Sequence, residues 1–180
     1  MKLIKKIYNK NHIIEFYDFK KIEKFLKNQV SEIDIIMIDK RLMKNNIIKK
    51  TQKKYSARCF LLKGHEKIKS LSNFNYLAER ILKIGIQRKS KIISIGGGTV
   101  GDLSGYLAST LLRGIDHIMI PTSLLAMVDS SIGGKTGVNS NYGKNLIGSF
   151  YLPKKVLICP DFLKTLSLRE LNCGFAEIIK

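Results

Sequence analysis

A chain of 180 residues, 44% hydrophobic and 26% charged, has the length and composition of a single globular domain that buries its own core. It contains no apolar run of the roughly 18 residues that cross a bilayer, and no signal-peptide core follows Met1, so we expect a cytoplasmic protein without a membrane partner. The net charge of +18 suggests nucleic acid as a partner, but the lysines are scattered and do not gather with aromatic residues on one element. Nucleic acid is therefore not the partner we expect.

The three cysteines, Cys59, Cys159 and Cys173, lie far apart and form no C-x-x-C pair. This spacing argues against a disulfide framework and against a cysteine zinc site. We expect small buried thiols in a reducing compartment.

The chain opens with two loosely alternating segments, 2–8 and 12–17, which predict a hairpin at the edge of a sheet. Asp18 then opens a helix that continues to about Asn28, and the apolar run Ile33–Ile38 predicts a buried strand. Asp39 directly follows that strand. Its carboxylate could accept hydrogen bonds from a ribose, or it could cap the next helical segment.

Alternating strands and helices continue through the next part of the chain. We expect a basic helix over Leu42–Lys54, a strand over Ala57–Leu62, a loop over 63–69 and a helix over Leu71–Ile86. Elements that alternate at this spacing indicate βαβ units and a mostly parallel sheet.

A glycine-rich turn lies near the middle of the chain, in the stretch Lys91–Asp102. The apolar run Ile92–Ile95 predicts a buried strand, and the spacing after Gly96-Gly97-Gly98 predicts a helix. Unobstructed backbone N–H groups and the positive end of that helix would stabilise a pyrophosphate. The alternative is a tight turn that binds no ligand.

The remaining segments continue the pattern. We expect a strand over Asp116–Ile120, a helix that starts at Pro121-Thr122-Ser123 and stops at Gly133-Gly134, and a last strand over Val156–Cys159. Val138–Tyr151 is punctuated by glycines and receives no assignment. Ser167 and Glu170 have the spacing of a capping box, which predicts a helix that continues to Lys180.

The second half of the chain contains six short motifs, which follow one another between residues 96 and 180. They are Gly96-Gly-Gly-Thr-Val-Gly-Asp102-Leu-Ser-Gly105, Arg113-Gly114, Pro121-Thr-Ser-Leu-Leu, Val128-Asp-Ser-Ser-Ile-Gly-Gly-Lys-Thr136, Gly143-Lys-Asn145 and Gly174-Phe-Ala-Glu-Ile-Ile-Lys180. Together they resemble the 3-dehydroquinate synthase family of sugar-phosphate cyclases. The resemblance implies an α/β fold with a Rossmann-like, mostly parallel sheet and helices on both faces. It assigns residues 1–165 to an NAD-binding domain and 166–180 to the first helix of an all-helical second domain that is otherwise absent from this chain.

The implied activity is that of a phosphate-eliminating lyase of the shikimate pathway. Such an enzyme converts 3-deoxy-D-arabino-heptulosonate 7-phosphate to 3-dehydroquinate and phosphate, uses NAD catalytically, requires Zn²⁺ or Co²⁺, and works as a homodimer on a small anionic sugar phosphate. Transient oxidation acidifies the neighbouring C–H, so the protein must mainly position the substrate and stabilise charge.

The resemblance also assigns roles to individual residues. The NAD-binding set would be Asp39, Gly64, His65, Glu66, Lys67, Ile68, Lys69, Gly97, Gly98, Thr99, Val100, Gly101, Asp102, Thr122, Ser123, Lys135, Lys144, Phe162, Leu163, Lys164 and Thr165. The substrate would meet Asp129, Lys135, Asn145, Arg113 and Lys180, and Glu177 would be a zinc ligand. By spacing alone, Glu177 and Lys180 would instead form an ordinary i,i+3 ion pair on a helix surface.

This sequence departs from the family at two places. His65 stands where the family usually has glycine, and the helical domain that supplies two histidine zinc ligands is missing from this chain. Two alternatives therefore remain open. The chain could be an inactive, truncated nucleotide-binding fragment, or it could belong to a related sugar-phosphate cyclase with another ketose substrate.

Overall fold

The computed structural model describes residues 2–7 and 10–180, and its centre is a seven-stranded sheet with the order β1-β2-β9-β6-β5-β3-β4. Only β1 pairs antiparallel with its neighbour β2, and every other pair in this sheet is parallel. The predicted mostly parallel sheet with an edge hairpin is thus confirmed. The strands are β1 (Lys2–Ile7), β2 (Lys10–Phe16), β3 (Ile35–Asp39), β4 (Cys59–Leu62), β5 (Lys91–Gly96), β6 (Asp116–Pro121) and β9 (Lys155–Ile158).

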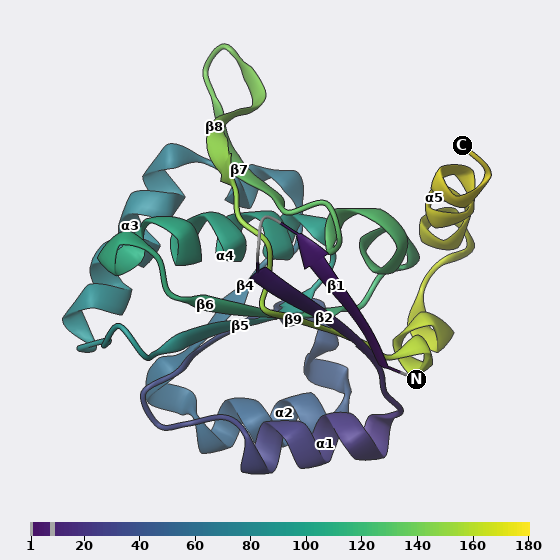
Figure 1. Cartoon of the computed structure of the whole chain (residues 1–180), viewed down its shortest axis with the longest axis horizontal. Coiled ribbons are helices and arrows are strands. Elements are labelled where there is room, and N and C mark those ends of the chain that lie inside the picture. Colours follow the sequence, from purple (N-terminus) through teal and green to yellow (C-terminus); the bar gives the residue numbers. More distant parts are fainter. Residues whose placement is uncertain (1, 8–9) are drawn as a thin grey trace.

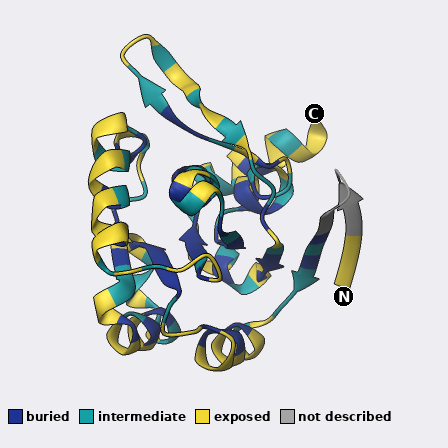
Figure 2. Cartoon of the chain, turned by 60° about the vertical axis from the view of Figure 1, so that its left-hand side comes forward, coloured by how far each residue is buried: buried dark blue, intermediate teal, exposed yellow. Residues whose placement is uncertain are grey.

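Helices cover both faces of the sheet, as predicted (Figure 1). Helices α1 (Phe19–Asn28) and α2 (Asn46–Lys54) lie on one face, and α3 (Leu71–Lys83) and α4 (Gly98–Thr110) lie on the other. Each face of the sheet has its own hydrophobic core, because successive residues of the central strands point their side chains to opposite faces. Figure 2 shows the buried strands inside and the exposed sides of the helices outside.

The sheet changes its winding direction between β3 and β5. From β3 the chain passes through α2 to β4 on one side, whereas from β5 it passes through α4 to β6 on the other side. In open α/β sheets a crevice forms at such a switch point, outside the carboxyl ends of the strands. The glycine turn after β5 lies at this edge.

Three predicted boundaries differ from the structure by more than two residues. The expected helix Leu42–Lys54 is two elements, because the Asn45 side chain accepts hydrogen bonds from the N–H groups of Ile47 and Ile48 and so starts a new helix after the short 3-10 helix Lys40–Lys44. Pro121 ends β6 instead of starting a helix, and the segment after it contains a π-helical turn, Ala126–Ser130. Helix α3 stops at Lys83, before Gly85 with its φ of +83°.

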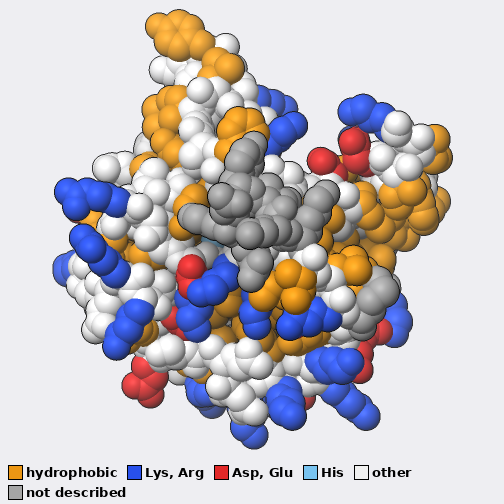
Figure 3. Space-filling model, viewed as in Figure 1, with side chains coloured by type: hydrophobic (Ala, Val, Ile, Leu, Met, Phe, Trp, Pro, Cys, Tyr) orange, Lys and Arg blue, Asp and Glu red, His pale blue; other side chains and the backbone are white. Residues whose placement is uncertain are grey.

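The glycine-punctuated stretch that received no assignment forms a second, two-stranded sheet. Strand β7 (Lys135–Ser140) pairs antiparallel with β8 (Gly143–Phe150), and the hairpin projects from the α4 side of the molecule (Figure 1). A Cβ at Gly148 would lie 2.1 Å from the Thr136 carbonyl oxygen, so this strand crossing requires glycine. Hydrophobic side chains gather on the hairpin and on α5 (Leu168–Ile179) in Figure 3.

Helix α5 starts with the predicted capping box, in which the Ser167 side chain accepts a hydrogen bond from the Glu170 backbone N–H and the Glu170 side chain accepts one from the Ser167 backbone N–H. None of the helices in residues 2–7 and 10–180 is long and apolar enough to cross a membrane.

Candidate functional site

A cavity of about 950 Å³ opens at the carboxyl edge of the sheet. It receives side chains or backbone from the ends of β3, β5 and β6 and from the segments after β4 and β9. Ten residues of the predicted NAD-binding set line it, namely Asp39, Gly64, Gly97, Gly98, Thr99, Thr122, Ser123, Phe162, Lys164 and Thr165. Residues that are far apart in sequence therefore meet in one place.

The glycine turn leaves the start of α4 open to this cavity. Gly97 occupies the N-cap position and has no side chain, so the N-cap provides no hydrogen bond to the first N–H groups of the helix, and no side chain within residues 2–7 and 10–180 caps them. Beside the turn, a Cβ at Gly98 would lie 3.0 Å from Ser130 Oγ. This buried hydroxyl has no hydrogen-bond partner within the described part of the chain. Free backbone donors at a helix N-terminus are suited to an anion such as a pyrophosphate.

Asp39 caps the 3-10 helix that follows β3, which was one of its two predicted roles. Its Oδ1 accepts a hydrogen bond from the Arg41 backbone N–H at 3.0 Å, and its Oδ2 accepts from Arg41 Nη2 at 2.7 Å. Arg41 Nη2 also donates to the Gly64 carbonyl oxygen at 3.1 Å. A Cβ at Gly64 would lie 1.9 Å from Asp39 Oδ2, so only glycine allows the loop to approach this carboxylate.

A second cluster lies where the loop before α3 meets the β7–β8 hairpin. The Lys69 side chain is only 3% exposed, and its Nζ lies 2.7 Å from Asp102 Oδ2 and 4.0 Å from Glu66 Oε1. Lys69 Nζ also donates to the side-chain oxygen of Asn145. Four predicted site residues thus form one network, and it joins the predicted cofactor loop to the predicted substrate residue Asn145.

Opposing effects act on the Asp102 carboxyl in this network. Burial raises its pKa above the ordinary value, and the hydrogen bond and charge of Lys69 act in the opposite direction. The nearby carboxylates of Glu66 and Asp129 also raise the pKa. The predicted substrate residue Asp129 therefore lies close enough to this cluster for its charge to raise the pKa of Asp102.

The network depends on Asn139, a residue that the sequence reasoning missed. Its side-chain N–H₂ donates to Glu66 Oε1 at 2.9 Å, and its Oδ1 accepts the Asn145 backbone N–H at 2.9 Å. Asn145 adopts a φ of +57°, a left-handed conformation that asparagine tolerates better than most residues. Two other side chains of the site were missed as well, Arg41 and Ser130. An arginine two residues after a strand-end aspartate would have been the available signal for Arg41.

Three members of the predicted NAD-binding set are buried beneath the site. Ile68 and Val100 belong to the core on the α4 side of the sheet, and a Cβ at Gly101 would lie 2.2 Å from the Met119 methyl group. These residues hold the turn against the sheet. Five other members, which do not line the cavity, stand on the flanking loops and on the hairpin, namely His65, Lys67, Leu163, Lys135 and Lys144.

Arg113 lies away from the glycine turn of the predicted cofactor site. It follows the carboxyl end of α4, whereas the glycine turn lies at the amino end of this helix. A helix of 13 residues is about 20 Å long. Arg113 and the glycine turn therefore lie at opposite ends of this helix.

Glu177 and Lys180 form the i,i+3 ion pair that their spacing predicts, with 3.6 Å between Lys180 Nζ and Glu177 Oε1. Glu177 lies on α5, and Lys180 follows the last residue of this helix. No three His, Cys, Asp or Glu side chains gather as metal ligands within residues 2–7 and 10–180. Glu177 alone does not make a metal site, since a catalytic zinc takes three protein ligands.

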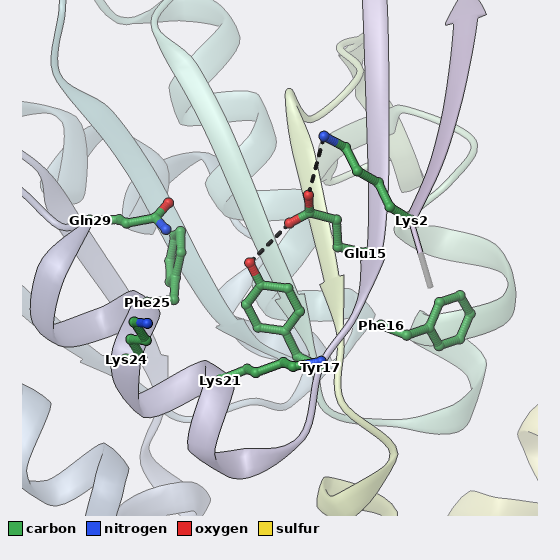
Figure 4. A pocket seen from close by; sticks show the side chains of 8 residues that line it. All are labelled: Lys2, Glu15, Phe16, Tyr17, Lys21, Lys24, Phe25 and Gln29. Carbon is green, nitrogen blue, oxygen red and sulfur yellow. Dashed lines mark hydrogen bonds and ion pairs between the residues drawn. The ribbon is translucent and has the colours of Figure 1, made fainter.

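A smaller cavity of about 420 Å³ lies between β2 and α1 (Figure 4). There Glu15 accepts a hydrogen bond from the Tyr17 hydroxyl at 2.9 Å and pairs with Lys2 at 3.7 Å. Burial and this carboxylate raise the pKa of Tyr17 to about 12. None of the predicted site residues lines this cavity, so the candidate site is the cavity at the carboxyl edge.

A doubly wound parallel sheet with an uncapped glycine turn at its switch point defines the class of Rossmann-like α/β folds. Within this class, residues 59–173 match the family described as 3-dehydroquinate synthase N-terminal. The chain belongs to this family, as its motifs predicted.

Curated relatives agree with this assignment. The chain is 47% identical to the 3-dehydroquinate synthase of Pelagibacter ubique over 166 residues, which are 89% of this chain and 45% of the relative. It is 55% identical to the 3-dehydroquinate synthase of Alkaliphilus metalliredigens over 120 residues, which are 67% of this chain and 34% of the relative. The chain thus spans less than half the length of these relatives.

Solved structures show the same fold. A crystal structure of 2-deoxy-scyllo-inosose synthase with carbaglucose-6-phosphate, NAD⁺ and Co²⁺ is 25% identical, has a TM-score of 0.83 and covers 99% of this chain and 50% of that chain. The 2-epi-5-epi-valiolone synthase of Streptomyces hygroscopicus with NAD⁺ and Zn²⁺ is 28% identical, has a TM-score of 0.78 and covers 92% of this chain and 47% of that chain.

Proposed function

We propose that this chain is the NAD-binding part of a 3-dehydroquinate synthase, a lyase that converts 3-deoxy-D-arabino-heptulosonate 7-phosphate to 3-dehydroquinate and phosphate. The observation that carries the proposal is the uncapped glycine turn facing a cavity of about 950 Å³. Relatives with that name at 47% and 55% identity support the reaction, and neighbours solved with NAD⁺ support the cofactor.

The residues at the carboxyl edge fit NAD. The pyrophosphate would accept hydrogen bonds from the first N–H groups of α4, and the Ser130 hydroxyl beside Gly98 would gain a partner. Thr122 and Ser123 would line the same cavity from the end of β6, and Phe162 would provide an apolar wall. When bound, NAD supplies a hydride acceptor for the transient oxidation of a substrate hydroxyl.

The protein groups would mainly hold and stabilise an anionic substrate. Lys135 stands at the start of β7, and Lys69 holds the side chain of Asn145, which lies on β8. Both side chains would contact the substrate next to the nicotinamide. Lysine and asparagine at these places would donate hydrogen bonds to a carboxylate, a phosphate or hydroxyl oxygens. Asp129 would accept a hydrogen bond from a substrate hydroxyl, and the last helix would bring Lys180.

The distant position of Arg113 fits a homodimer, in which this residue would act in the site of a second copy. A metal does not fit the described residues by themselves. Glu177 is the one predicted ligand, and it pairs with Lys180.

Another sugar-phosphate cyclase is the second candidate, since the solved neighbours act in that wider group. Their identities of 25% and 28% are well below the 47% and 55% of the 3-dehydroquinate synthases. Sequence identity therefore favours the shikimate-pathway substrate.

A chimera tests the proposal. This chain would replace the matching segment of the Pelagibacter ubique relative, and phosphate release from the 7-phosphate substrate would be measured with NAD and Zn²⁺ present. We expect turnover, with 3-dehydroquinate identified by NMR, and a loss of at least a hundredfold in the Lys135→Ala chimera. A chimera that binds NAD but acts only on another ketose phosphate would contradict the proposed substrate.

A further inference from the structure

The wall of the carboxyl-edge cavity beside β3 presents cations. The side chain of Asp39 is only 3% exposed, whereas that of Arg41, which covers it, is 62% exposed. Arg41 Nε and Nη2 together contact both carboxylate oxygens, at 2.7 to 3.1 Å. A ligand that reaches this wall therefore meets the guanidinium of Arg41 before it meets the carboxylate.

A second cation stands on the same side of the same turn. Arg41 and Lys44 both line the cavity, and they are three residues apart in the 3-10 helix Lys40–Lys44. Side chains at i and i+3 lie directly above one another in a 3-10 helix, because this helix has 3.0 residues per turn. The two cations therefore point to one side.

The two cations of this wall differ in how far they are paired. Among the described residues, Lys44 makes no ion pair. Arg41 pairs with Asp39 and reaches Glu170 at 3.4 Å, but Glu170 is itself 41% exposed, so solvent weakens that contact. An anionic group that entered here would meet the ammonium of Lys44 and would compete with Glu170 for Arg41, since the two cations share the wall with the carboxylates of Asp39 and Glu170.

We propose that Arg41 and Lys44 accept the 2′-phosphate of an adenine dinucleotide, so that the cavity binds NADP as well as NAD. This inference rests on the proposed function, because it places the adenosine ribose at the end of β3. In dinucleotide folds a carboxylate at this position serves the 2′-hydroxyl of NAD, and a nearby arginine accommodates the 2′-phosphate of NADP. This chain has both residues, and the arginine is the exposed one.

The chemistry of the two groups suits a phosphate. A guanidinium donates two parallel N–H groups to phosphate oxygens, and an ammonium adds a point charge. Arg41 could keep its Nε contact with Asp39 while it turns an Nη toward a ligand, since Arg41 has more donors than Asp39 can accept.

The test is calorimetric titration of the full chain with NAD, with NADP and with the half-ligands 5′-AMP and adenosine 2′,5′-bisphosphate. Three variants are compared with the wild type, namely Arg41→Gln, Lys44→Gln and, as a matched control, Lys40→Gln. Lys40 is an exposed lysine of the same 3-10 helix that does not line the cavity. Lys44→Gln breaks no ion pair among the described residues, so it remains informative if Arg41→Gln fails to fold.

We expect the wild type to bind NADP within tenfold of NAD, and the bisphosphate more tightly than 5′-AMP. Arg41→Gln and Lys44→Gln should each weaken NADP at least fivefold and change NAD less than twofold, whereas Lys40→Gln should change neither. Wild-type protein that binds NAD but binds NADP more than a hundredfold more weakly would overturn the inference and leave the proposed function standing. Equal losses of NAD and NADP in Lys44→Gln would also overturn it. Absence of binding by both dinucleotides would contradict the proposed function itself.

Discussion

The substitution Lys69→Met removes the only cation in contact with Asp102 among the described residues while keeping the bulk of the side chain. Lys69 is 3% exposed and Asp102 is 23% exposed, so the remaining carboxylate would stay largely buried without its partner. Breaking a buried pair from one side costs about 3–5 kcal/mol, and the partial exposure of Asp102 reduces this to about 2 kcal/mol. For a chain of this length, the loss corresponds to a melting temperature lower by about 6 °C.

The assay is urea unfolding at pH 7 of Lys69→Met, Asp102→Asn and the double variant. Because the double variant leaves no charge at either position of the Lys69–Asp102 pair, it should be more stable than the sum of the single losses by about 1 kcal/mol or more. The matched control is Lys154→Met, whose partner Asp116 forms an exposed pair, and we expect a loss below about 0.5 kcal/mol. If Lys69→Met cost no more than Lys154→Met, or if the two single losses simply added, the Lys69–Asp102 contact would not hold the loop and α4 together.

Three further outcomes follow from single positions. Gly64→Ala would place a Cβ 1.9 Å from Asp39 Oδ2, so we expect NAD affinity measured by calorimetry to fall at least tenfold, and an unchanged affinity would contradict the close approach. Burial lowers the pKa of His117 to about 4 from the ordinary 6.5, and between these pH values the unfolded chain binds a proton that the folded chain does not. The stability that depends on neutral His117 is therefore fully present above pH 6.5 and falls by about 3 kcal/mol as the pH decreases toward 4. The urea midpoint of His117→Asn should change less over this pH range than that of the wild type, and an equal change in both would contradict the assignment. Cys173 is exposed at the cavity and Cys159 is buried, so a thiol reagent should modify Cys173 before Cys159. Saturating NAD should slow the modification of Cys173 at least threefold. Equal modification rates for the two thiols would contradict the exposed position of Cys173.

The parallel core was predictable because its signals are local and strong. Continuous apolar runs such as Ile92–Ile95 have a single favourable place, inside a sheet covered on both faces. The capping pair Ser167 and Glu170 fixes the start of α5 by the same local chemistry. The glycine turn was predictable from its composition, and the structure adds that none of the described side chains caps the helix there.

The hairpin β7–β8 was not predictable from its local pattern. Its strands contain Gly137 and Gly148, which have low strand propensity and are there because two backbones cross closely. Its register is set by contacts with α4 and with the Lys69 loop, such as the hydrogen bond from Asn139 N to the Lys69 carbonyl oxygen at 2.6 Å. Such contacts leave no periodic signal in the sequence.

The candidate site was predictable as a set of residues and not as an arrangement. The motifs indicated Asp39, Glu66, Lys69, Asp102 and Asn145, but their spacing could not show that the last four share one network. The pairing of Asp39 with a neighbouring arginine likewise depends on side-chain direction, which sequence spacing does not give.

The most direct test of the central claim is calorimetric titration of NAD into the wild type, into Gly97→Val and into Gly133→Ala. Gly97 lines the cavity, and a Cβ there would lie 3.3 Å from Ser123 Oγ, so the branched side chain of valine would fill the space in front of α4. Gly133 is the control, since a Cβ added there meets no atom within 4 Å. We expect the wild type and Gly133→Ala to bind NAD with equal affinity, and Gly97→Val to lose at least thirtyfold. Binding of NAD by Gly97→Val as tightly as by the wild type would show that the glycine turn does not hold the cofactor.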